Sequence, residues 1–365
     1  MSRPDPVDID YREKYASLER FSIGVIGAGY IVRDVQLPAY AYAGFRVAAI
    51  ASRTPARAKA VAEEFGIERC YDDWRDMIAD PSIEILDLAY PPDEQFEIIK
   101  AAAGHSDHIR GILAQKPLAM DFETATEAVN ICKDAGILLA VNQNMRFDQS
   151  IRTLKGMLDR GDLGEPVIAE ILMHVRLDWQ PYSADYHRKA MLIMSIHHLD
   201  VFRFLFGEPE RIIASVRPDV PPDERRTDQL AMYILEYQSD FRAVAIDNCY
   251  SWADKGIRWR VDGSHGIAEG TVGWPDHPWG SPSTFDFISR DEPDSRYSPR
   301  WGERWFPHAF VGTMGQLLQA VVEDKEPELS GRDNLRTVAL LDAAYLSARE
   351  HRAVSPDEIT RRSQA

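Results

Sequence analysis

Two glycines near the start of the chain are the first residues whose spacing indicates chemistry. Gly27 and Gly29 directly follow the apolar run 22–26, and a helical pattern begins soon after them. Glycine permits a tight turn here and lets backbone N–H groups approach a pyrophosphate at the start of a helix. The third glycine of the dinucleotide-binding fingerprint is replaced by Val32. An ordinary turn is the alternative, but the position directly after an apolar strand favours a dinucleotide site.

The end of the second apolar run, 46–50, bears on the choice of cofactor. Ser52 and Arg53 follow this run, where an Asp or Glu usually binds a free ribose 2′-hydroxyl. A hydroxyl and a guanidinium suit a 2′-phosphate, because they can form charge-assisted hydrogen bonds with it. We therefore expect NADP or NAD, with a preference for NADP. The alternative is that Arg53 stacks on the adenine or faces solvent.

Two turns that contain proline follow later apolar runs. Pro91 comes after the run 83–88, and Gln115-Lys116-Pro117 comes after the run 111–114. Ligands of open parallel sheets bind at the carboxyl ends of the strands. A lysine at this edge would lie beside the nicotinamide, bind the reacting oxygen and stabilise its negative charge during hydride transfer. From spacing alone, a surface lysine is the better interpretation.

A polar and aromatic stretch precedes the helical pattern that contains His197. Aromatic faces and hydrogen-bonding side chains suit a carbohydrate ring, whose C–H face stacks and whose hydroxyl groups need partners. A packed loop with exposed charges is the alternative. The stretch contains Asp178, Trp179, Tyr186, His187 and Arg188. A second such cluster, which could reach across a subunit boundary, consists of Trp301, Trp305, Phe306 and His308.

The elements that must position these residues are of two kinds. Between residues 21 and 144, five short apolar runs alternate with helical patterns, which is typical of a doubly wound parallel sheet in a Rossmann α/β domain. After residue 147, six runs mostly alternate polar and apolar residues, and helical patterns at 151–160 and 192–206 accompany them. Such alternation predicts a mostly antiparallel, open sheet in an α+β domain. We expect an extension at 1–20, the Rossmann dinucleotide-binding domain at 21–145 and the α+β domain at 146–365.

Composition excludes several classes of partner. The formal net charge of -16 argues against nucleic acid or an anionic membrane surface as the main partner. No run of about 18 apolar residues occurs, and the first 20 residues do not resemble a signal peptide. The 3 cysteines lie far apart, so a reducing cytoplasm is expected. The histidines lack metal-ligand spacing, and we expect no metal site.

Four motifs together resemble the Gfo/Idh/MocA family of oxidoreductases. They are Gly27-Ala28-Gly29-Tyr30, Pro91-Pro92, Gln115-Lys116-Pro117 and the segment 197–209, in the family's order over nearly the whole chain after residue 20. The resemblance implies that Lys116 matches the catalytic lysine of the family's Glu-Lys-Pro motif. It also implies that His197 matches the histidine that exchanges a proton with the substrate hydroxyl. A substrate-binding second domain, and a homodimer or homotetramer formed through its open sheet, are further implications.

The His197 helix departs from the family pattern. Many members carry an Asp four residues before the histidine, whereas this chain has Ile193, and Ser195 replaces the accompanying glycine. Either the substrate is held differently, or His197 acts without that carboxylate. Asp200, on roughly the same helix face, could orient the imidazole, with a helix cap or a solvent salt bridge as the alternative. His198 points about 100° away from His197 and is expected to be structural.

These expectations describe an NAD(P)-dependent oxidoreductase that acts on a secondary hydroxyl or ketone of a sugar, inositol or glycoside. A non-catalytic nucleotide-binding sensor of the same fold is the alternative, which Ile193 keeps open. Lys116 and His197, supplied by different domains, are expected to converge on one substrate oxygen. The expected cofactor contacts are Gly27, Gly29, Tyr30, Ile31, Ser52, Arg53, Pro91, Gln95, Lys116 and Asn144. The expected substrate contacts are Lys116, Arg146, Trp179, Tyr186, Arg188 and His197.

Overall fold

The chain divides by packing into two units. The computed structural model describes residues 9–12, 15, 18, 20–176, 183, 186–218, 228–253, 255–274 and 281–363. The parallel-sheet unit comprises the described residues of Lys14–Asn144 and Pro307–Val338. The mixed-sheet unit comprises those of Met1–Glu13, Met145–Phe306 and Ala339–Ala365. Residues 307–338, which the sequence assigned to the second domain, thus pack with the parallel sheet.

The parallel-sheet unit is built on six parallel strands in the order β3-β2-β1-β4-β5-β6. Every residue of β1, β4 and β5 is buried, because helices cover both faces of the sheet. The strands are β1 (Ile23–Ile26), β2 (Val47–Ala51), β3 (Arg69–Tyr71), β4 (Ile85–Leu88), β5 (Gly111–Ala114) and β6 (Leu138–Val141). The doubly wound sheet confirms the predicted fold. The sequence missed β3, whose three residues include an exposed Cys70 and show no apolar run.

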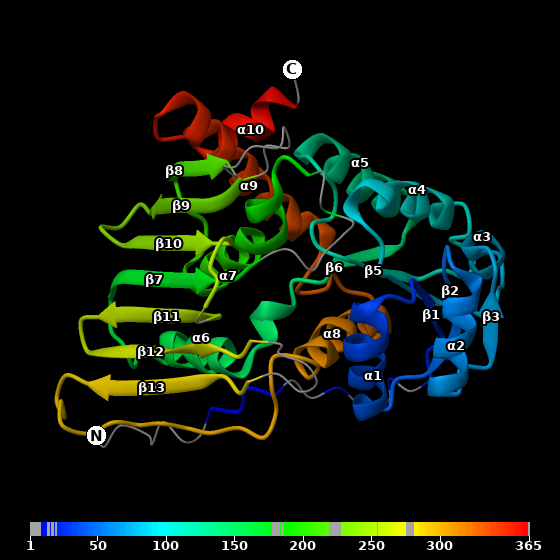
Figure 1. Ribbon diagram of the computed structural model, residues 1–365, viewed down its shortest axis with the longest axis horizontal. Helices are drawn as coiled ribbons and strands as arrows, with labels where there is room; N and C mark the ends of the chain where they lie inside the picture. The colour runs from blue at the N-terminus through cyan, green and yellow to red at the C-terminus, as the bar shows by residue number, and fades with distance from the viewer. Residues whose placement is uncertain are drawn as a thin grey trace. The chain divides into compact units, whose positions relative to one another are not determined.

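Helices flank this sheet on both faces, and Figure 1 shows α4 and α5 on one side with α1 and α8 on the other. This placement follows from the strand order, because the chain moves outward from β1 in one direction and from β4 in the other. The helices are α1 (Leu37–Ala43), α2 (Pro55–Phe65), α3 (Trp74–Ile78), α4 (Pro92–Ala103), α5 (Phe122–Ala135) and α8 (Ala309–Glu323). A π-helical turn, η2 (Ile31–Gln36), leads into α1.

The mixed-sheet unit contains a seven-stranded sheet in the order β13-β12-β11-β7-β10-β9-β8. All neighbours are antiparallel except β7 and β10, so the prediction of a mostly antiparallel sheet is confirmed. The strands are β7 (Pro166–His174), β8 (Arg211–Pro218), β9 (Asp228–Glu236), β10 (Arg242–Asn248), β11 (Gly256–Gly263), β12 (Gly266–Val272) and β13 (Thr284–Ser289). The sequence did not predict β13.

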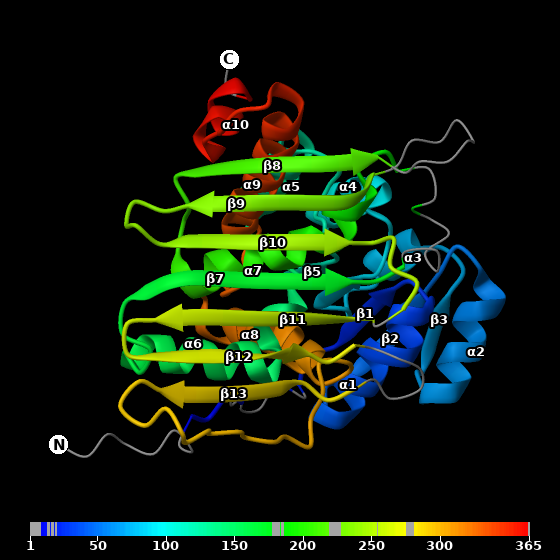
Figure 2. The same ribbon diagram turned by 60° about the vertical axis from the view of Figure 1, so that its left-hand side comes forward.

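One face of this sheet is covered and the other is open. Helices α6 (Gln149–Arg160) and α7 (Ile196–Phe206) lie against one face, and Figure 2 shows the opposite face in front, with no described helix of this unit over it. Along β10, buried residues alternate with partly exposed ones, as this arrangement requires. The open face carries Leu172, Met232 and Ile234, each about 40% exposed.

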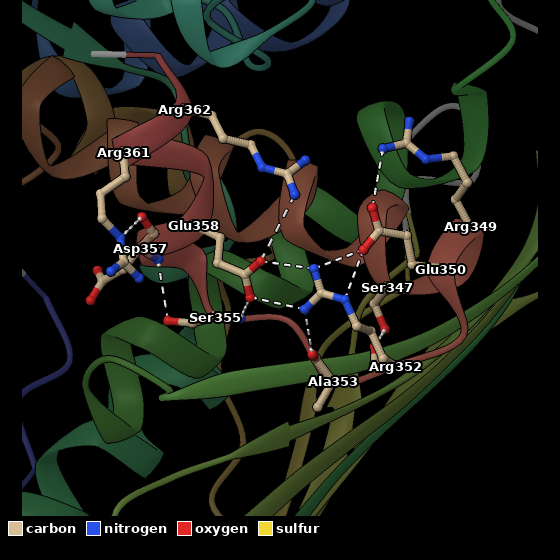
Figure 3. Close-up of polar contacts among 10 residues, drawn as sticks. All are labelled: Ser347, Arg349, Glu350, Arg352, Ala353, Ser355, Asp357, Glu358, Arg361 and Arg362. Carbon is tan, nitrogen blue, oxygen red and sulfur yellow. Dashed lines mark hydrogen bonds and ion pairs between the residues drawn. The ribbon is translucent and has the colours of Figure 1, made fainter. Parts of the chain in front are cut away.

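The C-terminal segment forms hydrogen bonds with the edge strand β8 and salt bridges within itself. Residue Val354, which follows α9 (Gly331–Glu350), exchanges two backbone hydrogen bonds with Ile212 of β8. Figure 3 shows the guanidinium of Arg352 between two carboxylates, 2.7 Å from Glu350 and 2.8 Å from Glu358 of α10 (Pro356–Arg362). These contacts join the end of α9 to α10. None of the helices in the described ranges is long and apolar enough to cross a membrane.

Candidate active site

The parallel sheet brings many of the predicted cofactor residues to one edge. Gly27, Ser52, Pro91 and Lys116 follow the carboxyl ends of β1, β2, β4 and β5. Asn144 follows β6 in the same way. The strands are parallel and the order reverses between β1 and β4, which is the place where such sheets bind nucleotides.

Gly27 makes the turn that leaves β1. Its φ is +132°, and a Cβ added there would lie 2.7 Å from the carbonyl oxygen of Ala89, so other residues would be strained and would clash. Its N–H donates to the Ala51 carbonyl at 2.8 Å, which fixes the turn to β2. By contrast, a Cβ at Gly29 would meet no atom within 4 Å. The backbone at Gly29 is therefore approachable, as a site for a pyrophosphate requires.

The helix after the turn carries a substitution at its third fingerprint position. Val32 is fully buried, and it lies in the π-helical turn η2, which begins at Ile31. Tyr30 precedes this turn and is 41% exposed. The first backbone N–H groups of the helix still lie next to Gly29, so the local geometry fits an anion at this end of β1.

Arg53, at the end of β2, pairs with a carboxylate. Its guanidinium lies 2.5 Å from Glu94 of α4, and it also sits 5.2 Å from the ring centre of Tyr90. The Arg53 side chain is 60% exposed. The sequence did not predict this ion pair, which must open before Arg53 can form a bidentate contact with a phosphate.

Gln95 holds the lysine-containing turn through its backbone. The buried side-chain amide donates to the carbonyls of Gln115 and Pro117, each at 3.0 Å, and its Oε1 accepts from the Gln115 N–H at 2.7 Å. Gln95 comes from the first turns of α4, so α4 fixes the segment that follows β5. Gln95 was predicted to contact the cofactor, and its side-chain amide instead binds the backbone of the Lys116 turn.

Lys116 lies in the middle of this turn in an environment that disfavours charge. The side chain keeps a small exposed surface, but burial of its amine lowers the pKa of Lys116 to about 7. An ordinary lysine titrates near 10.4. Burial of the amine does not fit the alternative of a plain surface lysine, and the predicted catalytic role of Lys116 stays a prediction.

The polar residues after β6 are buried. Asn142, Gln143 and Asn144 are all nearly inaccessible, and the Asn144 amide donates to the Asn142 carbonyl at 3.3 Å. The Asn142 N–H donates to the Ala114 carbonyl at 2.8 Å, which ties this segment to β5. Three consecutive amide side chains in a core need a reason beyond packing, and their place at the carboxyl end of β6 keeps Asn144, an expected cofactor contact, as a site candidate.

In the mixed-sheet unit, His197 lies near the start of α7. It is 4% exposed, and its ring stands edge-on to Trp305, with 6.0 Å between ring centres and an interplanar angle of 84°. The sequence grouped Trp305 with a separate aromatic cluster and did not foresee this contact. Trp301 instead packs near Tyr11 and Phe285, and His308 belongs to the parallel-sheet unit, where it contacts Tyr42. The predicted cluster is therefore not a single group.

Asp200 binds an arginine. Both of its oxygens accept hydrogen bonds from Arg146, at 2.6 and 2.7 Å, and the pair is almost fully buried. Arg203, one turn further along α7, lies 3.8 Å from Asp200 and binds Glu208 at 2.7 Å. The sequence offered an imidazole-orienting carboxylate, a helix cap or a solvent salt bridge. The structure shows a buried, bidentate salt bridge.

His198 faces the sheet. Its Nδ1 lies 2.7 Å from Asp247 of β10, and the hydroxyl of Tyr233 donates to the other Asp247 oxygen at 3.3 Å. All three side chains are buried. This arrangement agrees with the structural role that the helix geometry predicted for His198.

Ile193 and Ser195 lie in a π-helical turn, η5 (Met191–Ser195), that leads into α7. Both are buried, as are their neighbours in the turn. The position at which the family resemblance implies a carboxylate is thus occupied by a buried apolar residue in this chain.

The polar stretch before α7 is only partly described. Asp178 and Trp179 lie outside the described residues. Arg188 forms a salt bridge with Asp342 of α9, and its guanidinium lies 4.2 Å from the ring centre of Tyr345. Asp342 and Tyr345 line a pocket of about 420 Å³ together with Arg188.

Lys116 belongs to one unit and His197 to the other, so their convergence on one substrate oxygen stays a prediction.

Comparison with known proteins adds to this geometry. Residues 21–143 match the model of an oxidoreductase family with an NAD-binding Rossmann fold, named GFO_IDH_MocA. Residues 151–269 match the model of the GFO/IDH/MocA C-terminal domain.

Relatives match over most of the chain. D-apiose dehydrogenase of Paraburkholderia graminis is 28% identical, over 93% of this chain and 90% of that protein. Myo-inositol 2-dehydrogenase of Thermotoga maritima is 26% identical, over 83% of this chain and 89% of that protein. An oxidoreductase from Agrobacterium radiobacter, solved with NAD+, L-tartaric acid and magnesium, is 25% identical with a TM-score of 0.80, over 93% of this chain and 99% of that one. Levoglucosan dehydrogenase, solved with NADH and levoglucosan, has the same fold at 20% identity and a TM-score of 0.78, over 92% of this chain and 98% of that one.

Proposed function

Because this chain belongs to the GFO/IDH/MocA family of oxidoreductases with an NAD-binding Rossmann fold, we propose that it oxidises a secondary hydroxyl, or reduces the ketone, of a sugar, inositol or glycoside. The relatives named as apiose and inositol dehydrogenases support this substrate class. The observation that carries the proposal is Lys116, a lysine with its pKa lowered to about 7 at the nucleotide-binding edge of the parallel sheet.

The chemistry that the nicotinamide supplies when bound is the acceptance or donation of a hydride. The chain's own part is to hold the substrate oxygen and to move its proton. The ammonium of Lys116 donates a hydrogen bond to that oxygen and stabilises the negative charge that develops on it. A ring nitrogen of His197 takes the hydroxyl proton in oxidation and returns it in reduction. The reference pKa of histidine, about 6.5, suits both directions near neutral pH.

The other predicted substrate contacts divide by their partners. Trp179 and Tyr186 remain proposed contacts for a sugar ring. Arg146 is better assigned to positioning, because its guanidinium holds Asp200 of the His197 helix in two hydrogen bonds. Arg188, which pairs with Asp342, stays a proposed substrate contact only if that salt bridge opens.

Replacement of Lys116 tests the proposal. We expect Lys116→Met to lower turnover by roughly 10²–10³-fold, because an electrostatic contact to the reacting oxygen is lost, and to leave nucleotide binding nearly unchanged. Lys133→Met, at an exposed position of α5, is the matched control. The readout is absorbance of the reduced nicotinamide during titration with polyols, sugars and glycosides. Wild-type turnover in Lys116→Met would refute the assignment.

A finer proposal concerns the cofactor. Ser52 and Arg53, with no acidic residue at the end of β2, support NADP over NAD. The salt bridge with Glu94 opposes this preference, because a carboxylate at 2.5 Å competes with a 2′-phosphate for the guanidinium. We therefore expect Glu94→Gln to shift the ratio of NADP to NAD affinity upward, and Arg53→Ala to shift it downward. An unchanged ratio in both variants would contradict the proposal.

The alternative function is a non-catalytic nucleotide-binding sensor. It rests on Ile193, a buried apolar residue at the position where the family resemblance implies a substrate-contacting carboxylate. A protein that binds nucleotide but never reduces or oxidises it across the substrate panel would favour this alternative. Turnover with any member of the panel excludes it.

We also propose that a second copy of the chain covers the open face of the mixed sheet. Apolar side chains there form a continuous row, since Met232, Ile246 and Leu172 are aligned across β9, β10 and β7. Large exposed apolar patches on a sheet are typical of interfaces. Light scattering of the wild type against Met232→Lys tests this, because a buried lysine would dissociate the oligomer.

The 3 free cysteines, with no disulfide among the described residues, support the proposed cytoplasmic location.

A further inference from the structure

The turn after α4 gathers three metal-ligating side chains. His105, Asp107 and His108 follow the last residue of this helix closely, and one ligand atom of each lies within 4.8 Å of the others. From the sequence we expected no metal site, because the histidines lack metal-ligand spacing. The turn brings them together without a helical or strand repeat.

His108 has the geometry of a prepared ligand. Its Nε2 lies 2.9 Å from the Ile78 carbonyl, and since a carbonyl can only accept, this nitrogen carries the proton. In the neutral ring, Nδ1 then holds a lone pair. The side chain is nine-tenths buried, and its Nδ1 is directed away from Ile78, with the Asp107 carboxylate 3.2 Å away. Metal-binding histidines commonly donate their second N–H to a backbone carbonyl in this way.

The carboxylate of Asp107 faces the same nitrogen. Its Oδ1 lies 3.2 Å from His108 Nδ1, so two lone-pair atoms oppose each other whenever the imidazole is neutral. A cation between them would remove that repulsion. Ligands about 2.0–2.2 Å from a tetrahedral zinc ion are roughly 3.3–3.6 Å apart, which is close to this separation. The Asp107 side chain is 80% exposed, so it can adjust while His108 stays fixed.

We propose that His105, Asp107 and His108 bind one divalent transition-metal ion, with Zn²⁺ as the physiological choice. Two imidazoles and one carboxylate suit zinc and copper better than magnesium or calcium, which prefer oxygen ligands. Water would supply the fourth ligand.

The site lies away from the proposed hydride chemistry. The turn precedes β5, whereas the Lys116 turn follows it, so the four residues of β5 separate them by about 13 Å. The ion is therefore assigned a stabilising role. It would tie the end of α4 to the end of α3 through the hydrogen bond from His108 to Ile78.

Calorimetric titration of the full-length, untagged protein with ZnCl2 after EDTA treatment tests the site. We expect one high-affinity Zn²⁺ per chain and a higher thermal midpoint with the metal, because a ligand that binds only the folded state stabilises it. His105→Gln, Asp107→Asn and His108→Gln should each weaken binding roughly tenfold or more. His351→Asn, which removes an exposed histidine of the mixed-sheet unit, is the control and should bind as the wild type does.

Two outcomes would overturn the proposal: a wild-type protein that binds no Zn²⁺, or three turn variants that all bind it with wild-type affinity. Because His108→Gln could perturb folding, the half-exposed His105 and the exposed Asp107 provide the decisive variants.

Discussion

Buried ionisable groups have different surroundings in two regions of the molecule. One region is the parallel sheet around β4 and β5, and the other is the helix α7. In the first region, burial brings the pKa of both Lys116 and Asp87 to about 7. On α7, ionisable groups have partners: Asp200 forms a salt bridge with Arg146 and Arg203 one with Glu208, and the Nδ1 of His198 lies 2.7 Å from Asp247. Asp148 and Asp228 of the mixed-sheet unit are intermediate, since burial raises the pKa of both while hydroxyl groups bind them.

The difference matches what each region is proposed to do. A lysine that must hold an oxygen through two protonation states is tuned by desolvation, which moves its pKa toward the working pH. A helix that must present His197 in one orientation is better fixed by charge pairs, because a bidentate guanidinium contact is directional. The surroundings in the parallel sheet thus set the proton affinity of Lys116, and the contacts along α7 set the position of His197.

The largest expected effect is on stability, from removing one member of the pair on α7. Asp200→Asn leaves the Arg146 guanidinium buried without its counter-ion, which costs about 3–5 kcal/mol. Urea unfolding measures the loss. The double variant Arg146→Met/Asp200→Leu should recover most of it, because two apolar side chains of similar volume need no charge pairing. If the double variant is no more stable than Asp200→Asn, pairing is not what holds this part of α7.

Much of the fold and of the candidate site could be predicted from the sequence, for physical reasons. Local signals identified the strand ends at the nucleotide-binding edge. They are the apolar run 22–26 before Gly27, and Pro92 and Pro117 in the two later turns. The short strand β3, the strand β13 and the helix α10 were missed because they lack a long apolar period. Contacts between distant segments were missed as well. No sequence pattern near Gln95 predicts that its side-chain amide binds the carbonyls of Gln115 and Pro117.

The ion pairs show the same limit. Arg146 and Asp200 are 54 positions apart, and Arg53 and Glu94 are 41 apart, so no spacing rule links them. The charge of an isolated arginine suggested a ligand contact, whereas each guanidinium has a carboxylate partner. A long-range counter-ion can be seen only when the fold brings the two together.

The second prediction tests Asp87, the buried acid of the first region. Asp87 accepts hydrogen bonds from Gln36 and Tyr40, and burial raises its pKa to about 7, above the unfolded value of about 3.9. Its contribution to stability is therefore complete below about pH 4 and is lost as pH rises toward 7. Asp87→Asn should remove this loss and raise the free energy of unfolding at pH 8 by roughly 2–4 kcal/mol.

The comparison of two pH values isolates this effect. At pH 4 the two proteins should be nearly equally stable, and the gap should open toward pH 8. The asparagine amide can also donate to Gln36 Oε1, a buried atom without a hydrogen-bond partner. A variant that is less stable than wild type at pH 8 would show that Asp87 is ionised and satisfied in the folded protein.

The third prediction sharpens the role of Gln95 as a positioning residue. Gln95→Leu removes three hydrogen bonds to the Lys116 turn, and we expect turnover to fall about tenfold, as for about 1.4 kcal/mol of lost alignment. The pH dependence of turnover should also shift, because a displaced Lys116 is less buried and regains a higher pKa. Gln319→Leu, at the surface of α8, is the control. A lower stability with an unshifted pH profile would reduce Gln95 to a packing role.

The smallest effect is expected where charge pairs are exposed. Arg352 bridges Glu350 and Glu358 in the C-terminal network of Figure 3, yet its side chain is 40% exposed, so water and salt screen these contacts. Arg352→Ala should therefore leave the thermal midpoint within experimental error of wild type, both at low salt and in 1 M NaCl. A salt-dependent drop in the midpoint for Arg352→Ala would mean that α10 is held by charge, and that surface pairs here act as the buried pair on α7 does.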